Sequence, residues 1–275
     1  MARIIDTTPA FDTFARAAFM ESPHVRERMW KERYEGAHRE VFDAFYAGSG
    51  NTDGLSKVVR DLSTVRSRVR DATSVERRLI EEVEPLVQAA LGLPSDPSPQ
   101  HVLLVGSFSV DADVGRLRDD VTLFHCLEWF HGEEGMRVLV AHETTHAWHE
   151  IALGIAPPED DAAWMAFYEG VGIMGSRAAV SGRPPEQYFW YGHGGFADWL
   201  PWCEEHRDEL LERFAAAIDD PTAVETWFGG GLVEGRWRVG YYVADVLVSR
   251  LGRSLPDLVA VSVDDARKAI KEALA

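Results

Sequence analysis

The order in which hydrophobic patterns follow one another limits what this chain can fold into. Residues 24–46 place apolar side chains at helical spacing among charges, and two later segments before residue 99 repeat that pattern. Residues 101–110 and 120–127 are instead rich in β-branched and aromatic side chains, which is typical of strands. Helical spacing returns after residue 133. Helices segregated from a few strands predict an α+β fold, mostly helical, with a small sheet before the central helix.

A stiff proline-rich connector, Pro94 to Pro99, is the predicted boundary inside this arrangement. It separates an N-terminal helical region, residues 1–99, from a second region, residues 100–275, and we expect the two to form one compact unit. A polar loop is expected over residues 111–119 and a long irregular one over 181–201. We expect helices over residues 24–46, 55–69, 74–91, 133–153, 162–180, 204–218, 237–251 and 263–274, with Ser74 as an N-cap.

Composition narrows the class of partner. The 275 residues carry a net charge of -17, which repels phosphate backbones and argues against nucleic acid as a partner. The N-terminal sequence lacks the basic and apolar stretches of a secretory signal, and no window approaches the roughly 18 to 20 apolar residues of a membrane span. Cys126 and Cys203 lack the CxxC spacing of a thiolate zinc site, so we expect reduced, buried thiols. These features predict a cytoplasmic protein with no membrane partner.

The motif that carries chemistry is HETTH, residues 142–146. Positions i and i+4 share one face of a helix, so His142 and His146 can place imidazole nitrogens on one cation. Glu143 is rotated by about 100° from His142, so it can reach a bound water without taking a coordination position. Uncharged and apolar neighbours favour a buried helix whose histidines face a cleft. The motif predicts a Zn2+ cofactor.

A third protein ligand is needed, because catalytic zinc sites take three protein ligands and a water. The pattern HExxHxxGxxH, which supplies a third histidine, is absent, since His149 and Ala152 stand at its last two positions. Glu169 is the better candidate, because 23 residues after His146 allow one turn and a second, antiparallel helix. Gly170 and Gly172 beside it would allow the two helices to approach closely around the metal.

Three segments together resemble a known family. HETTH, then FYEGVG at residues 167–172, then VGYYVADVLV at residues 239–248 resemble predicted zinc-dependent proteases once described as a domain of unknown function. These proteins are similar to the gluzincins, whose third ligand is a glutamate on the helix after the HExxH helix. The resemblance covers roughly residues 100–260; the first hundred residues and the 181–201 loop match nothing in the family pattern. It implies a zincin-like fold with thermolysin-like active-site helices and a metallopeptidase that hydrolyses peptide bonds.

The expected mechanism needs a base and a second hydrogen-bond donor. Glu143 would take the proton of the attacking water and deliver it to the leaving amine. Tyr241 is the expected donor to the oxyanion, because Tyr242 shares a face with a core-like apolar stripe. His193, in a glycine-rich loop, is an alternative donor.

Other polar residues are expected to support the site. Three aspartates, which the sequence does not separate, are candidate partners for the imidazoles: Asp160, Asp161 and Asp245. His125 and His131 are interpreted as structural or surface residues. Residues 120–127 are the expected free strand edge on which an extended peptide substrate would pair.

Two other functions use the same helix. One is a zinc hydrolase of a small amide or ester, which a closed cleft without a free strand edge would favour. The other is a catalytically inactive metal-binding regulatory protein. The intact Glu143 argues against it, because a structural zinc needs no general base. Histidine and carboxylate ligands also accept other divalent ions.

Overall fold

The computed structural model describes residues 2–156, 158 and 160–275. The chain is mixed α+β and 62% helical with a small four-stranded sheet, which confirms the α+β part of the predicted fold class. It forms two compact units. The first holds residues up to Glu84 and Asp96–Met136, and the second holds Pro85–Ser95 and Arg137–Ala275. This division differs from the predicted boundary at residue 99, because it falls inside two helices, α5 (Leu62–Leu91) and α6 (Glu133–Leu153).

The first unit is built on a four-stranded sheet with the order β1-β2-β4-β3. Its strands are β1 (Arg3–Asp6), β2 (Gln100–Leu104), β3 (Ala112–Leu117) and β4 (Asp120–Cys126). β1, β2 and β4 run parallel, and β3 pairs with β4 as an antiparallel hairpin. The described sheet therefore has β1 and β3 as its edges.

Three predictions about this sheet were wrong. The prediction of helices alone in the first hundred residues misses β1, whose four residues are too short to show a period of two. The predicted polar loop over 111–119 contains β3, which is only part-buried and so carries few apolar side chains. The predicted free edge over 120–127 is β4, which lies between β2 and β3. Its burial on both faces is why it reads as the most apolar strand.

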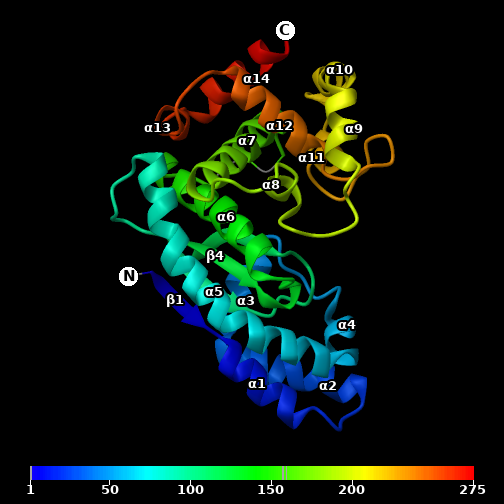
Figure 1. The fold of residues 1–275 in the computed structure, drawn as a ribbon. Coiled ribbons are helices and arrows are strands. Elements are labelled where there is room, and N and C mark those ends of the chain that lie inside the picture. The colour runs from blue at the N-terminus through cyan, green and yellow to red at the C-terminus, as the bar shows by residue number, and fades with distance from the viewer. Residues whose placement is uncertain (1, 157, 159) are drawn as a thin grey trace. The chain divides into compact units, whose positions relative to one another are not determined.

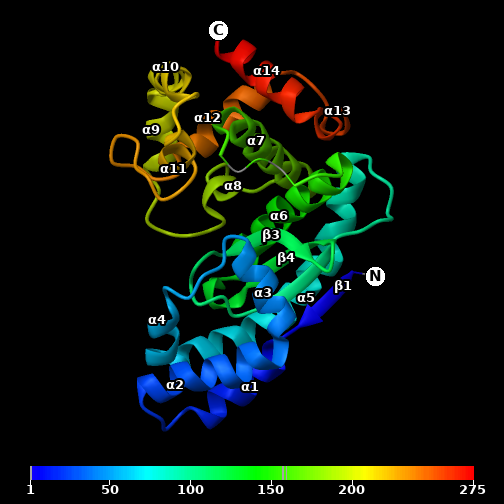
Figure 2. The same ribbon diagram turned by 180° about the vertical axis from the view of Figure 1, so that it is seen from behind.

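Helices cover both faces of the sheet. On one face, Phe45 of α3 (Arg39–Ala47) packs its ring 5.6 Å from that of Phe124 in β4. On the other face, where His125 points, lies α5. Figures 1 and 2, which view the molecule from opposite sides, show these two helices on opposite sides of the strands.

A chain of four buried polar side chains joins α5 to the sheet. Glu76 Oε1 lies 3.0 Å from His125 Nδ1, and His125 Nε2 lies 3.0 Å from His101 Nδ1. His101 Nε2 in turn lies 3.6 Å from Glu84 Oε2. All four residues are buried, so His125 is structural, as the sequence predicts. His131, by contrast, lies on the exposed segment before α6.

The N-terminal helices pack around an aromatic cluster. The rings of Phe11 and Trp30 both lie edge-on to Tyr34, at centroid distances of 5.4 and 4.8 Å. The predicted helix over 24–46 is split by a π-helical turn and a short 3-10 turn, while the two helices predicted over 55–91 are rearranged. Most of that segment is the single helix α5, so Ser74 lies inside a helix instead of capping one. The remaining elements are α1 (Thr8–Ala17), α2 (Pro23–Met29), η1 (Trp30–Glu35), η2 (Gly36–His38) and α4 (Leu55–Arg60).

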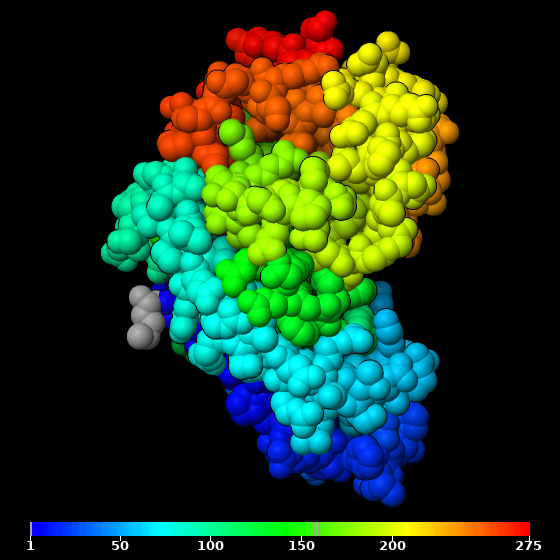
Figure 3. All heavy atoms as spheres, in the orientation of Figure 1, coloured from blue at the N-terminus to red at the C-terminus, as the bar shows by residue number. Residues whose placement is uncertain are grey.

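The regular elements of the second unit, within its described residues, are helices, apart from an isolated β-bridge between Val233 and Arg236. α7 (Ala162–Ala179) is buried on nearly all sides, as expected for a helix that is apolar all round. It packs against α12 (Val239–Arg250) and α14 (Val263–Leu274). Side chains fill the spaces between these ribbons in the space-filling view (Figure 3). The shorter helices are α8 (Gln187–Trp190), α9 (Trp199–Glu205), α10 (Arg207–Ala217), α11 (Ala223–Trp227) and α13 (Leu255–Val259).

Two further expectations concern the chain as a whole. Cys126 and Cys203 are buried free thiols, as the sequence predicts. Within the described ranges, no helix combines the length and the apolar character that crossing a bilayer requires.

Candidate metal centre

The HETTH motif lies in the middle of α6. Glu133 and Glu134 lie in its first turn, where their negative charges interact favourably with the positive end of the helix dipole. Gly154, with φ 69°, follows the last turn in the left-handed conformation that commonly ends a helix. His142 and His146 therefore sit in regular helix, one turn apart, where their side chains share a face.

Glu169 lies in the second turn of α7. The N-cap of this helix is Asp161, whose carboxylate accepts a hydrogen bond of 2.7 Å from the backbone N–H of Trp164. The same carboxylate lies 2.7 Å from Arg267 of α14. Both carboxylate oxygens of Asp161 thus help to fix the start of the helix that carries Glu169. Positions 157 and 159, between α6 and α7, lie outside the described residues.

The three predicted ligands come together. His142 Nε2 lies 3.0 Å from Glu169 Oε2 and 2.9 Å from His146 Nε2. His146 Nε2 lies 3.4 Å from the same carboxylate oxygen. Across the described ranges, this is the only group of three or more histidine, cysteine or acidic side chains whose ligand atoms converge closely enough to hold a metal ion. Two imidazoles and one carboxylate are a donor set that could hold a divalent metal ion and leave a coordination position for water.

The protonation states suit a cation. Burial, followed by the charge of His146, lowers the pKa of His142 to about 4. Burial alone would raise the pKa of the Glu169 carboxyl, but hydrogen bonds with His142 and His146 outweigh it and hold that pKa far below its usual range. At neutral pH His142 is therefore neutral and Glu169 ionised, which are the forms in which these side chains bind metals.

Gly172 makes room for both imidazoles. A Cβ atom at this position would lie 2.8 Å from His142 Cε1 and 2.8 Å from His146 Nε2. Gly175, one turn later, faces α6 in the same way, where a Cβ would meet Thr145 Oγ1. Gly170 faces α12 instead, where a Cβ would lie 2.6 Å from Ala244 O. The expectation of close helix approach therefore holds at Gly172 for the helix pair around the site, while Gly170 serves the packing of α7 on α12.

Aromatic rings line one side of the candidate site. Tyr168 stacks on His146 with a centroid distance of 3.9 Å, and its hydroxyl donates a hydrogen bond of 3.2 Å to Glu150. Burial, followed by the charge of Glu150, raises the pKa of Tyr168 well above its usual value, so the phenol stays protonated. His149 is buried beside Tyr168 and Trp164, away from the ligand cluster.

Two tyrosines and an arginine lie on another side of His142. The ring of Tyr191 lies 5.4 Å from the His142 ring, and the ring of Tyr241 lies 6.4 Å from it. The Arg238 guanidinium sits 3.9 Å above the Tyr241 ring, and it donates a hydrogen bond of 3.2 Å to the Tyr191 hydroxyl. Burial raises the pKa of Tyr191 well above its usual value, against the opposing charge of Arg238. Glu143, which is part-exposed, raises the same pKa further.

Sequence reasoning missed Arg238, Tyr191 and Tyr168 at this site. Tyr191 lies in the aperiodic 181–201 segment, and Arg238 precedes α12 by one residue. No helical or strand spacing singles out either residue. Tyr168 directly precedes the predicted ligand Glu169. This neighbouring position on the helix is the one sequence feature that could have indicated its place at the site.

Several predicted residues are used elsewhere. Tyr242 is buried and accepts a hydrogen bond of 3.2 Å from Arg207, so only Tyr241 of the pair lies beside His142. His193 lies after α8 and lines a cavity of about 240 Å3 that includes none of the three ligands. Of the candidate partners for the imidazoles, Asp161 caps α7, Asp245 forms a two-pronged ion pair with Arg177, and Asp160 is exposed. Within the described ranges, the Nδ1 atoms of both ligand histidines lack a hydrogen-bond partner.

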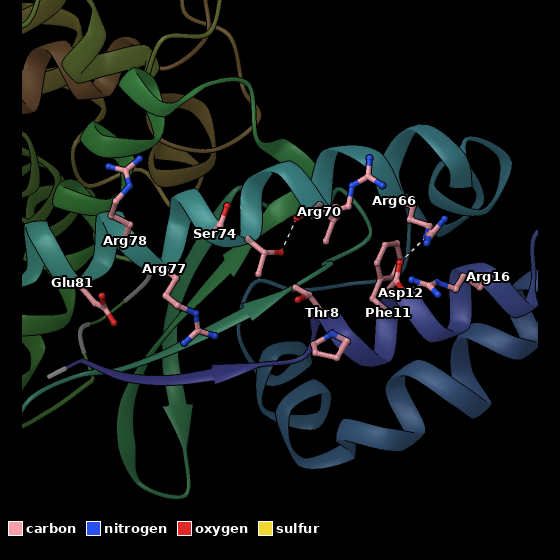
Figure 4. A pocket seen from close by; sticks show the side chains of 13 residues that line it. Thr8, Phe11, Asp12, Arg16, Arg66, Arg70, Ser74, Arg77, Arg78 and Glu81 are labelled. Carbon is pink, nitrogen blue, oxygen red and sulfur yellow. Dashed lines mark hydrogen bonds and ion pairs between the residues drawn. The ribbon is translucent and has the colours of Figure 1, made fainter.

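A larger cavity in the first unit does not compete with this site. It encloses about 580 Å3 between α1 and α5. Its arginines belong to ion pairs, such as Arg66 with Asp12 at 2.6 Å and Arg77 with Asp6 at 3.0 Å. Figure 4 shows Arg70 and Arg78 directed away from α1, so the cations do not converge on a common point.

Comparisons of the chain with protein families, with curated proteins and with solved structures found no match. The class of protein therefore rests on the fold and the site: an α+β protein with a buried His-His-Glu cluster on two neighbouring helices.

Proposed function

We propose that this protein is a zinc-dependent metallopeptidase with a zincin-like pair of active-site helices, α6 and α7. The observation that carries the proposal is the convergence of His142, His146 and Glu169, whose ligand atoms lie 2.9 to 3.4 Å apart. The orientation of two helices produces this cluster. Chance placement of an HExxH string would not bring a buried carboxylate onto the same point.

Zinc held by these three side chains would lower the pKa of a bound water towards about 7 and polarise the scissile carbonyl. Glu143, next to His142 on α6, would accept the proton of the attacking water and pass it to the leaving amine. Tyr241, whose ring lies beside His142, would donate a hydrogen bond to the oxyanion. Peptides are the proposed substrates, and a cytoplasmic location remains part of the proposal.

A substitution series tests the metal and the base separately. His142→Ala should abolish stoichiometric zinc binding, measured by elemental analysis of dialysed protein. His149→Ala is the matched control, because His149 is buried on the same helix but lies outside the ligand cluster. It should retain zinc.

Glu143→Gln should retain zinc and lose at least about a hundredfold in hydrolysis of an unfolded protein substrate, in the range of general-base catalysis. Full hydrolysis by this variant would rule out the assigned base. Hydrolysis of small esters or amides by the wild type, without peptide cleavage, would favour the alternative hydrolase. Zinc binding with no hydrolysis of any kind would favour a regulatory protein.

A further inference from the structure

The two candidate histidine ligands lack the hydrogen bond that usually fixes such a ligand. His142 and His146 direct their Nε2 atoms at Glu169, so these are the atoms that would bind a metal ion. A ligand imidazole usually donates its other ring N–H to a carboxylate or a carbonyl, which fixes the orientation of the ring. Among the residues that the structure describes, neither Nδ1 atom has such a partner, although both atoms are buried. The Cβ–Cγ torsion of histidine has only a broad preference, so another contact must fix these rings.

Two residues of α7 form a slot for the imidazole of His146. Tyr168 lies against one face of this imidazole, with a centroid distance of 3.9 Å and an angle of 19° between the rings. Gly172, one turn later on the same side of α7, lies against its edge, because a Cβ atom there would be 2.8 Å from His146 Cε1 and Nε2. Rotation of the imidazole about its Cβ–Cγ bond would press it against the tyrosine ring. The slot therefore restricts the ring to one plane.

Tyr168 is itself fixed at both ends of its side chain. Its hydroxyl donates a hydrogen bond of 3.2 Å to Glu150, which follows His146 by one turn on α6. Its ring packs near Trp164, one turn earlier on α7, at a centroid distance of 5.7 Å. Tyr168 and Glu150 are both buried, so water does not compete for these contacts. The tyrosine thus contacts α6 at two positions one turn apart, and its ring has little freedom to leave the imidazole.

We propose that Tyr168 is a positioning residue, which holds the imidazole of His146 in its metal-binding orientation by ring stacking. This inference rests on the proposed function, since it concerns the metal site of that function. Tyr168 is not a ligand itself, because its hydroxyl is directed at Glu150. Rotation of the His146 ring would carry its Nε2 atom away from Glu169 and His142, which lie 3.4 and 2.9 Å from it. Loss of the tyrosine ring should therefore weaken zinc binding although all three ligands remain.

The zinc affinities of two variants at this position test the inference. Tyr168→Leu removes the aromatic ring and should lower zinc affinity by about 10- to 100-fold, the usual effect of losing a residue that orients a metal ligand. Tyr168→Phe keeps the ring and should bind zinc as the wild type does, although it should lower Tm because the buried Glu150 loses a donor. Chelator competition on metal-free protein measures both. Equal zinc affinity in Tyr168→Leu and wild type would overturn the inference. An equal loss in both variants would also overturn it, because the hydroxyl and not the ring would then orient His146.

Phe167→Leu is the matched control for the loss of a buried aromatic ring. Phe167 precedes Tyr168 on α7 and is also buried, but its ring lies near His149 and Trp164, which are outside the ligand cluster. This variant should lower Tm and bind zinc normally. A loss of zinc affinity as large as that of Tyr168→Leu would contradict the inference, because weaker packing of α7 would then account for both.

NMR spectroscopy of the metal-free protein reports the stack directly. Protons above the face of an aromatic ring are shifted upfield, so the ring protons of His146 should be shifted in the wild type and in Tyr168→Phe. The shift should be lost in Tyr168→Leu and kept in Phe167→Leu. Its absence from the wild type would overturn the inference.

Zinc binding and hydrolysis, measured on the same variants, separate the two proposals. If the wild type binds zinc but hydrolyses nothing, the peptidase proposal fails, and a lower zinc affinity in Tyr168→Leu still supports the positioning role. If the wild type hydrolyses peptides and Tyr168→Leu binds zinc equally well, the positioning role fails and the peptidase proposal stands. If the wild type binds no zinc, both proposals fail.

Discussion

Replacing Gly172 by alanine tests whether the imidazole cluster is a metal site. The added Cβ would lie 2.8 Å from atoms of both His142 and His146, whereas ordinary contacts begin at 3.4 Å. Both rings would therefore have to retreat by several tenths of an ångström. Metal–ligand distances tolerate changes of only about 0.2 Å, so the variant cannot keep both nitrogens at bonding distance without moving α7 away from α6.

The size of the effect follows from this displacement. Disturbing residues that merely orient metal ligands lowers metal affinity by about 10- to 100-fold. Displacing two ligands directly should cost at least the upper end of that range, a hundredfold, or about 2.8 kcal/mol. The substitution would not destabilise the helix itself, because alanine is favoured over glycine in a helix interior by about 0.8 to 1.0 kcal/mol.

Zinc affinity should be measured by chelator competition on metal-free protein, together with the rise in Tm that saturating zinc produces. Gly175→Ala is the matched control. Its Cβ would press on Thr145 Oγ1 at 2.3 Å, between the same two helices but away from the imidazoles. It should lower Tm and bind zinc normally. Zinc binding by Gly172→Ala within a factor of two of wild type would refute the reasoning.

Two further predictions concern stability. Asp161→Ala removes the N-cap of α7 and the ion pair with Arg267, and should lower the free energy of unfolding by about 1 to 2 kcal/mol in urea titrations; no change would show that the cap at Trp164 contributes nothing. Burial holds the pKa of His101 at about 4, below its ordinary value near 6.5, despite the opposing effect of Glu84, whose carboxylate lies 3.6 Å away. The unfolded chain therefore binds this proton first as pH falls, so stability should decline between pH 6.5 and 4, by up to about 3 kcal/mol from this group. His101→Gln should flatten that part of the pH profile, and an unchanged slope would contradict the assignment.

The α+β class and the convergence of the three candidate ligands could be predicted because both depend on local spacing. The i, i+4 separation of His142 and His146 places them on one helical face in any fold that keeps the helix. Glu169 could be named because a helix follows after a short break, and short connections make neighbouring helices antiparallel. The strand character of residues 101–104 and 120–126 was visible because buried parallel strands are continuously apolar.

Tertiary structure alone decided the strand order and most of the residues around the ligands. Which strand is an edge depends on pairing between segments far apart in the chain, and β1 and β2 are separated by more than ninety residues. Arg238 and Tyr191 meet beside His142 through backbone conformations that no periodicity reports. Spacing along a helix is a property of the local chain. A contact between an irregular loop and the residue before a helix forms only when both segments have packed in the folded chain. The burial of side chains, and not their separation along the sequence, determines which of them touch.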